Sequence, residues 1–156
     1  DSVSLHVLRQ GMIQEVAVGS IALMSLSETT VLKWNGALIH NVPWFTSMQT
    51  GIEMEGAYIA KCASGAPCGR DGVWGKRRIV AANQQPVRSV EDLIAILQDP
   101  DLPSDVRLQV VNLKGRPDTV VLRRDERYWR SELIQWDATS QSWTRQTLAM
   151  DSETSN

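Results

Sequence analysis

The chain has 156 residues, of which 42% are hydrophobic and 22% are charged, as is typical of one globular domain with an extension. Its 16 Lys and Arg residues against 18 Asp and Glu residues give a formal net charge of -2, which argues against a dedicated nucleic-acid-binding protein. No apolar run approaches the roughly 20 residues that span a bilayer. We therefore expect neither a nucleic-acid partner nor a membrane partner.

The start of the chain predicts a β-hairpin. Residues 5–18 alternate apolar and polar positions around Gln10-Gly11. Residues 108–122 repeat nearly the same pattern around Lys114-Gly115, and a repeated closing hairpin indicates tandem units. We therefore expect residues 1–25 to be the trailing hairpin of an upstream unit or a connector, and residues 26–125 to be the complete domain.

The middle of the chain predicts short strands separated by turns. Residues 19–35 are expected to form an irregular connector, and the Gly-rich and Pro-containing residues 63–76 a loop. Strands are predicted over 37–41, 56–62 and 78–82, with a helical turn at 47–51 and a tight turn at 83–86.

Residues 89–98 carry the clearest helix signal. Ser89 is a good N-cap, and acids at 91 and 92 suit the helix dipole. Apolar residues at 90, 93, 94 and 97 have the spacing of one buried helix face, and Asp99-Pro100 ends the helix.

The end of the chain is rich in tryptophan. Three of the six Trp residues, at 129, 136 and 143, lie close to the C-terminus. We expect residues 126–149 to form a Trp-rich extension with a hairpin around residues 137–140, and residues 150–156 to be a disordered tail. The fold class predicted for the whole is mainly β with one or two helices (α+β), a small, partly open β-barrel or sandwich.

The order of these elements resembles that of a PDZ domain. Ser64-Gly65-Ala66-Pro67, then Gly72-Val73, then residues 78–87 (RIVAANQQPV) follow the segment that links strand to helix in the PDZ domains of HtrA-type serine proteases. Gly36-Ala37 with His40 is similar to the opening strand of tandem-PDZ HtrA-like proteases, closest to the fungal nuclear pro-apoptotic family. The Trp-containing tail at 127–129, 132 and 143–145 is similar to theirs as well.

The resemblance has consequences for fold and function. It implies a PDZ-like fold with the HtrA-type strand order, and a parent serine endopeptidase active in protein quality control and apoptosis in the nucleus, hence intracellular. Peptides, unfolded protein segments and other domains of the same protease would be its partners. The family's Gly-Asp before the third strand is replaced by Lys76-Arg77, and its Asn-Gly turn by Asn83-Gln84, which is tolerable if Gln84 avoids positive φ.

The resemblance also implies a peptide groove that works by β-augmentation, in which a peptide adds a strand to an exposed sheet edge. The carboxylate-binding loop would be Trp34, Asn35, Gly36 and Ala37, and the peptide-pairing strand would be Leu38, Ile39 and His40. The opposite wall would be the helix face of Val90, Ile94 and Leu97.

This apolar wall predicts which ligand the groove prefers. The last ligand side chain should be hydrophobic. By the resemblance, Val90 stands where Ser/Thr-selecting PDZ domains carry His. A hydrophobic residue is therefore also favoured two residues before the C-terminus of the ligand. The alternative is a degenerate PDZ domain with no peptide ligand, in which the three helix residues are only core and the domain has an architectural role between neighbouring domains.

Other chemistry is not expected. Cys62 and Cys68 are too few to fill a zinc site and are predicted to be packed thiols in a reducing compartment. Residues 69–76 lack the spacing of a phosphate-binding loop, and the basic run at 76–78 is short for a targeting signal. No nucleophile motif accompanies the two histidines, His6 and His40, so we expect no catalytic residues, metal or cofactor in this chain.

Overall fold

The computed structural model describes residues 2–20 and 28–148. Its elements are β1 (Ser2–Arg9), β2 (Met12–Gly19), β3 (Thr30–Trp34), β4 (Ala37–Asn41), α1 (Trp44–Thr50), β5 (Ala57–Cys62), α2 (Pro67–Arg70), β6 (Arg77–Ala82), β7 (Gln85–Pro86), α3 (Val90–Leu97), β8 (Asp105–Asn112), β9 (Pro117–Arg123), β10 (Glu132–Asp137) and β11 (Ser142–Thr147). Strands predominate and the helices are short, so the predicted α+β class is confirmed.

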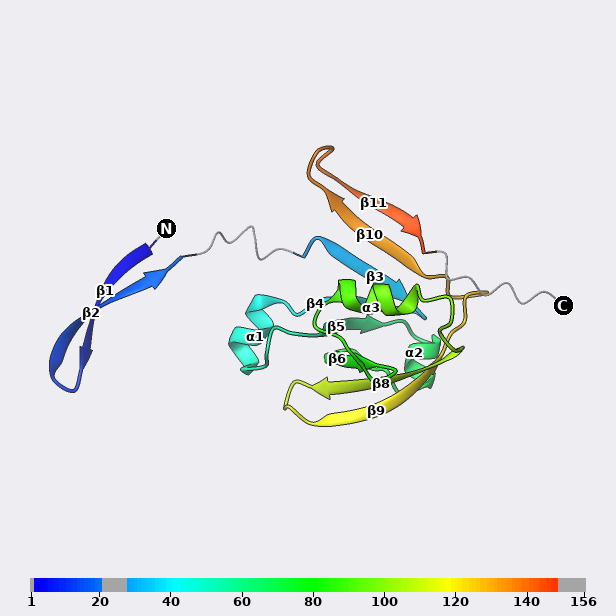
Figure 1. Ribbon diagram of the computed structural model, residues 1–156, viewed down its shortest axis with the longest axis horizontal. Helices are drawn as coiled ribbons and strands as arrows, with labels where there is room; N and C mark the ends of the chain where they lie inside the picture. Colours follow the sequence, from blue (N-terminus) through cyan, green and yellow to red (C-terminus); the bar gives the residue numbers. More distant parts are fainter. Residues whose placement is uncertain (1, 21–27, 149–156) are drawn as a thin grey trace.

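The strands form a separate β1–β2 hairpin and a nine-stranded sheet (Figure 1). The order in the large sheet is β11-β10-β3-β4-β5-β6-β8-β9, and β7 pairs with β6 off this path. All pairings are antiparallel. The predicted irregular connector over 19–35 is wrong at its C-terminal end, because residues 30–34 form strand β3, while residues 21–27 lie outside the described part of the chain.

Helix α3 covers the middle of the large sheet, and its buried residues belong to the hydrophobic core. The Ser89 side chain accepts a hydrogen bond from the Asp92 N–H at 3.2 Å, and the Asp92 carboxylate accepts one from the Arg88 N–H at 2.9 Å. The first bond satisfies an amide that the first turn of a helix leaves free, and the second joins the residue before the N-cap to the same turn. The helix then buries its apolar residues against β3, β4 and β5 (Figure 1).

The C-terminal hairpin extends the same sheet. β10 pairs with β3, with Leu133 opposite Leu32, and β11 pairs with β10. Leu133 is buried in the core cluster, and Glu132 forms an ion pair with Lys33 at 3.1 Å. The tail up to residue 148 is thus built into the domain, whereas the predicted disordered residues 150–156 lie outside the described residues.

The β1–β2 hairpin has no buried side chain. Val3, Leu5 and Val7 are 52%, 46% and 42% exposed. In the repeated pattern noted above they correspond to residues 106, 108 and 110 of β8, which are 0% exposed. The β1–β2 hairpin therefore has the apolar pattern of a closing hairpin, but within the described residues nothing packs over its apolar side chains. In that part of the chain, no helix is long and apolar enough to cross a membrane.

The β6–β7 turn departs from expectation. Asn83 and Gln84 both have positive φ, 47° and 69°, so the condition that Gln84 avoid positive φ is not met. Asn83 holds the turn, since its N–H donates to the Arg107 carbonyl and its side-chain oxygen accepts from the Arg107 N–H, both at 2.8 Å. Left-handed backbone costs a non-Gly residue roughly 1–2 kcal/mol.

We predict that Gln84→Gly stabilises the protein. The gain should be about 0.5 kcal/mol, because relief of the left-handed strain exceeds the added entropy of the unfolded chain. Thermal unfolding followed by circular dichroism measures it. Gln85→Gly is the control, since position 85 has no positive φ and should lose stability. An unfolding temperature for Gln84→Gly at or below wild type would contradict the strain argument.

Candidate peptide groove

Strand β4, the predicted peptide-pairing strand, is paired along both sides. On one side Leu38 and Ile39 face Lys33 and Leu32 of β3, and on the other side β4 pairs with β5, with a bulge between Leu38 and Ile39. A strand can add a peptide only along an edge whose N–H and C=O groups are free. The expectation of an open edge at Leu38, Ile39 and His40 therefore does not hold in this structure.

Strand β3 occupies the place that the peptide would take. It runs antiparallel to β4, and both strands contact α3. Its alternate residues Thr30, Leu32 and Trp34 are buried, and Leu32 and Trp34 are 0% exposed. The side of the groove that should receive ligand side chains is thus filled by the chain itself.

The polar end of Trp34 is not satisfied. Its indole nitrogen Nε1 is buried and has no hydrogen-bond partner among the described residues. A buried donor without an acceptor costs about 1–3 kcal/mol. The Trp34 side chain is therefore held in place by packing alone.

The predicted carboxylate loop is a buried two-residue turn. Asn35 and Gly36 have φ values of 48° and 80°, as a type I′ hairpin turn requires at both central positions. The Asn35 side chain is 0% exposed, donates to the Arg123 carbonyl at 3.0 Å and accepts from the Asp125 N–H at 2.9 Å. These bonds fix the turn against the segment that follows β9.

The turn is also covered from outside. A Cβ placed on Gly36 would clash with the Ala66 Cβ and lie 3.0 Å from the Trp129 ring. The Asn35 carbonyl accepts from the Cys68 N–H at 3.2 Å and the Gly36 carbonyl from the Ala63 N–H at 2.8 Å. The turn is closely packed, which leaves little room for a ligand carboxylate.

The three residues of the predicted helix wall are buried. Val90 and Leu97 are 0% exposed and Ile94 is 9% exposed, and all three belong to the core cluster. In this arrangement the three residues form the core that covers β3.

Polar groups join the end of β4 to the start of α3. Val90 N–H donates to the Asn41 side-chain oxygen at 2.8 Å, which joins the start of α3 to the end of β4. His40 Nδ1 lies 2.7 Å from the Asn41 carbonyl and 3.9 Å from the Glu28 carboxylate, and since a carbonyl only accepts, Nδ1 carries a proton. Burial raises the pKa of Glu28 from 4.5 to about 6, opposed by a hydrogen bond from the Asn41 backbone and reinforced by the charge of Glu91.

The two cysteines form a disulfide, so the prediction of packed thiols is wrong. Cys62 at the end of β5 and Cys68 in α2 have Cα atoms 6.0 Å apart, within the range that a disulfide bridges. The bond closes a loop over a sequence separation of 6 residues, and its presence is unexpected for a chain assigned to a reducing compartment. Among the described residues no group of metal-ligating side chains gathers.

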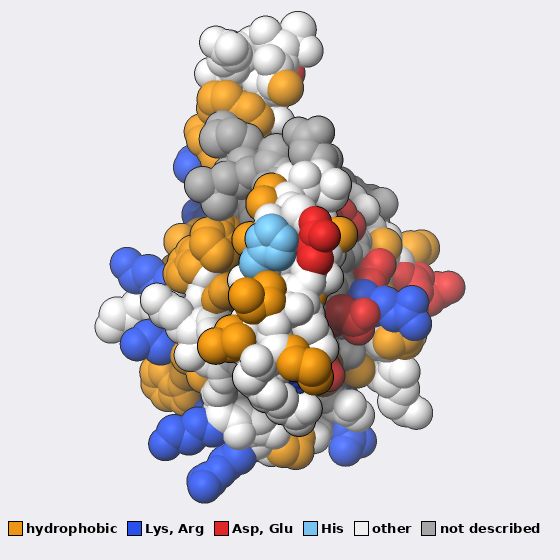
Figure 2. Space-filling model, turned by 90° about the vertical axis from the view of Figure 1, so that its left-hand side faces the viewer, with side chains coloured by type: hydrophobic (Ala, Val, Ile, Leu, Met, Phe, Trp, Pro, Cys, Tyr) orange, Lys and Arg blue, Asp and Glu red, His pale blue; other side chains and the backbone are white. Residues whose placement is uncertain are grey.

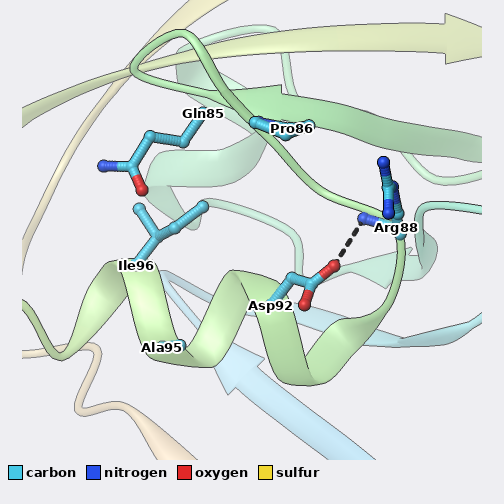
Figure 3. Close-up of a pocket in the computed structure, with 6 residues that line it drawn as sticks. All are labelled: Gln85, Pro86, Arg88, Asp92, Ala95 and Ile96. Carbon is cyan, nitrogen blue, oxygen red and sulfur yellow. Dashed lines mark hydrogen bonds between the residues drawn. The ribbon is translucent and has the colours of Figure 1, made fainter.

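A separate pocket of about 450 Å³ lies between α3 and β7 (Figure 3). Its Asp92 carboxylate is engaged by the Arg88 N–H at 2.9 Å, as the dashed line in Figure 3 marks. No predicted groove residue lines it; the lining residues are Gln85, Pro86, Arg88, Asp92, Ala95 and Ile96. The pocket is therefore distinct from the groove between β4 and α3.

Comparison with known structures defines the fold. The HtrA3 PDZ domain, solved bound to a phage-derived ligand (FGRWV), matches with a TM-score of 0.50 and 16% identity, over 62% of this chain and 88% of that chain. The fold is therefore that of a PDZ domain, as the element order predicted.

Sequence relatives extend this assignment, although no protein-family model matches the chain. The chain is 25% identical over 151 residues to Protease Do-like 7 of Arabidopsis thaliana, and 23% identical over 148 residues to Pro-apoptotic serine protease NMA111 of Lodderomyces elongisporus. These stretches are 95% and 94% of this chain but only 14% and 15% of the relatives' lengths. Fold and relatives together support the predicted assignment, a PDZ domain of an HtrA-like protease.

The close packing at the turn makes a prediction about Gly36. Gly36→Ala should destabilise the fold by about 1–3 kcal/mol more than Gly65→Ala, the usual range for overpacking. Both positions have positive φ, 80° and 78°, but only Gly36 meets neighbouring atoms; Gly65 has none within 4 Å. Urea unfolding of both variants separates the packing cost from the backbone cost. Equal losses would show that the turn is not closely packed.

The pKa of Glu28 predicts a pH dependence. A carboxyl whose pKa is raised on folding contributes stability below its unfolded value of 4.5, and this contribution is lost as pH rises through about 6. Wild type should therefore lose stability relative to Glu28→Gln between pH 4.5 and pH 7. Unfolding temperatures across this range test it, with the exposed Glu55→Gln as control. A constant difference between wild type and Glu28→Gln would contradict the assigned burial.

Proposed function

We propose that this chain is a PDZ module of an HtrA-like serine endopeptidase whose peptide groove is filled by its own strand β3, and that its resting role is architectural. The observation that carries the proposal is the pairing of β4 on both sides, with β3 along one side and β5 along the other, while α3 contacts β3 and β4. It favours the alternative of a degenerate PDZ domain over constitutive peptide capture.

Strand β3 satisfies the requirements of β-augmentation from within the chain. A ligand in this mode is an extended segment whose backbone pairs with the edge and whose alternate side chains fill pockets. β3 pairs with β4 in register, with Trp34 opposite Ala37 and Leu32 opposite Ile39, and it buries alternate side chains. An external peptide would have to replace these interactions while also losing its own freedom of motion.

The proposal also includes the activity of the whole protein to which this chain belongs. The relatives named as proteases support a serine endopeptidase as the parent, with catalysis placed outside these 156 residues. Regulation of that protease, protein quality control and a nuclear, fungal-type setting rest on the family resemblance. A role of the whole protein in apoptosis is supported by the name of the Lodderomyces elongisporus relative.

The architectural role needs surfaces for neighbouring domains. Figure 2 views the molecule from the hairpin side of Figure 1 and shows several groups of hydrophobic side chains on that face. Leu8, Met12 and Ile13 at the tip of the β1–β2 hairpin are 71%, 61% and 72% exposed. We propose that this hairpin closes an upstream PDZ-like unit, and that residues 28–148, including the tail, form the second unit.

Peptide capture is the second candidate. The HtrA3 PDZ domain was solved with a peptide ligand, and the unsatisfied Trp34 indole supports the idea that β3 is an imperfect occupant of this groove. In this reading a ligand with a hydrophobic C-terminus displaces β3 and then pairs with β4. Free peptide ends, unfolded protein segments and other domains of the same protease are its candidate partners.

A peptide titration separates the two candidates. The probe is the fluorescently labelled pentapeptide Thr-Val-Leu-Lys-Trp, which has the sequence of β3, prepared with a free and with an amidated C-terminus. The domain with its disulfide intact should show no saturable binding up to about 1 mM, which corresponds to about −4 kcal/mol. The reason is that β3 belongs to the same chain and therefore competes with the peptide at a high effective concentration.

Micromolar binding that requires the free carboxylate would overturn the architectural proposal. In that event Ile94→Ser, on the groove wall, and Ala95→Ser, on the exposed side of α3, would locate the site. Loss of binding in Ile94→Ser alone would assign it to the groove.

A further inference from the structure

The Cys62–Cys68 disulfide holds the loop that covers the β3–β4 turn. The amides of Ala63 and Cys68 donate to the two carbonyls of the turn, at 2.8 Å to Gly36 and 3.2 Å to Asn35. Ala66 lies between them in sequence, is 0% exposed and packs on Gly36. The segment that the disulfide closes therefore makes both the hydrogen bonds and the packing contact that fix the turn.

The disulfide also joins this loop to β5. Cys62 is the last residue of β5 and pairs with Ala37, the first residue of β4. Cys68 lies in α2, a helix of one turn whose stability cannot come from its own length. Without the covalent bond, the position of α2 against the turn depends on a few hydrogen bonds and on burial alone.

We propose that this disulfide is a redox-operated latch on the peptide groove, so that its reduction loosens α2 from the Asn35–Gly36 turn and allows β3 to leave β4. The inference rests on the proposed function, because it assumes that β3 occupies the groove at rest. The ligand admitted by the reduced form is an extended peptide with a hydrophobic C-terminus, the kind of segment that β3 represents.

A dithiol is the reductant class that fits. Its thiolate attacks the sulfur of Cys62, which is half-buried, whereas Cys68 is 0% exposed. The S–S bond breaks, and Cys68 leaves as a thiolate that takes up the proton lost by the attacking thiol. The second thiol of the reductant then displaces Cys62, which becomes a thiol. Two electrons and two protons pass to the protein, and the dithiol becomes a disulfide.

Trp74 offers a local signal for this step. Gly69 separates the two groups: a Cβ placed there would lie 3.5 Å from the Cys62 sulfur and 3.5 Å from the Trp74 ring. Trp74 is 55% exposed, so its environment can change without disturbing the core. Its fluorescence should therefore follow the redox state of the disulfide.

Amide hydrogen exchange tests the latch. Exchange is measured residue by residue on the oxidised domain, on the domain in dithiothreitol, and on the double variant Cys62→Ser/Cys68→Ser. Ser64→Ala, which keeps the disulfide, is the matched loop control. We expect β3 amides to exchange at least about tenfold faster in both disulfide-free forms while β8 amides stay protected, as in a local opening. The free-carboxylate Thr-Val-Leu-Lys-Trp peptide should bind these forms only.

Two results would overturn the latch. Equal β3 exchange with and without the disulfide would show that the bond does not hold the groove closed. A uniform rise that includes β8 would show that it stabilises the whole fold rather than the turn. Either result leaves the proposed function intact, whereas peptide binding to the oxidised domain would refute the proposed function itself.

Discussion

The structure depends on the pairing of β3 with β4 through the Asn35–Gly36 turn. A two-residue turn with positive φ at both positions aligns the two strands directly beside each other. In this arrangement Leu32 and Trp34 are buried, and the sheet continues through β3 and β10 to β11 rather than ending at β4. The same turn that makes the hairpin thus removes the edge at which a peptide could pair.

This arrangement exchanges one property for another. An exposed edge strand binds peptides but also pairs with unwanted chains. Here the edge is moved outward to β11, away from α3, and the residues of the groove wall become core. What is lost is a permanently open binding site. What is gained is a domain whose groove is stabilised by residues of its own chain, with exposed apolar residues left on the β1–β2 hairpin.

Much of the fold could be predicted from the sequence because local signals and long-range order agreed. The Ser89 cap, the apolar spacing of α3 and the three hairpins were expected at nearly the residues where they occur. β3 was missed although Thr-Val-Leu-Lys-Trp followed by Asn-Gly is a strong hairpin signal, because residues 19–35 as a whole were interpreted as an irregular connector. The disulfide could not be predicted, because two cysteines six positions apart bond only if the fold brings them together.

The most direct test of this account is the pairing of β3 with β4 in solution. Nuclear Overhauser effects between backbone protons of Leu32 and Ile39, and of Trp34 and Ala37, report this pairing residue by residue. Because these residues face each other in the hairpin, we expect both cross-strand contacts in the oxidised domain without any added peptide. Their absence, with β4 still paired to β5, would show an open edge and would contradict the central claim that the groove is filled by its own chain.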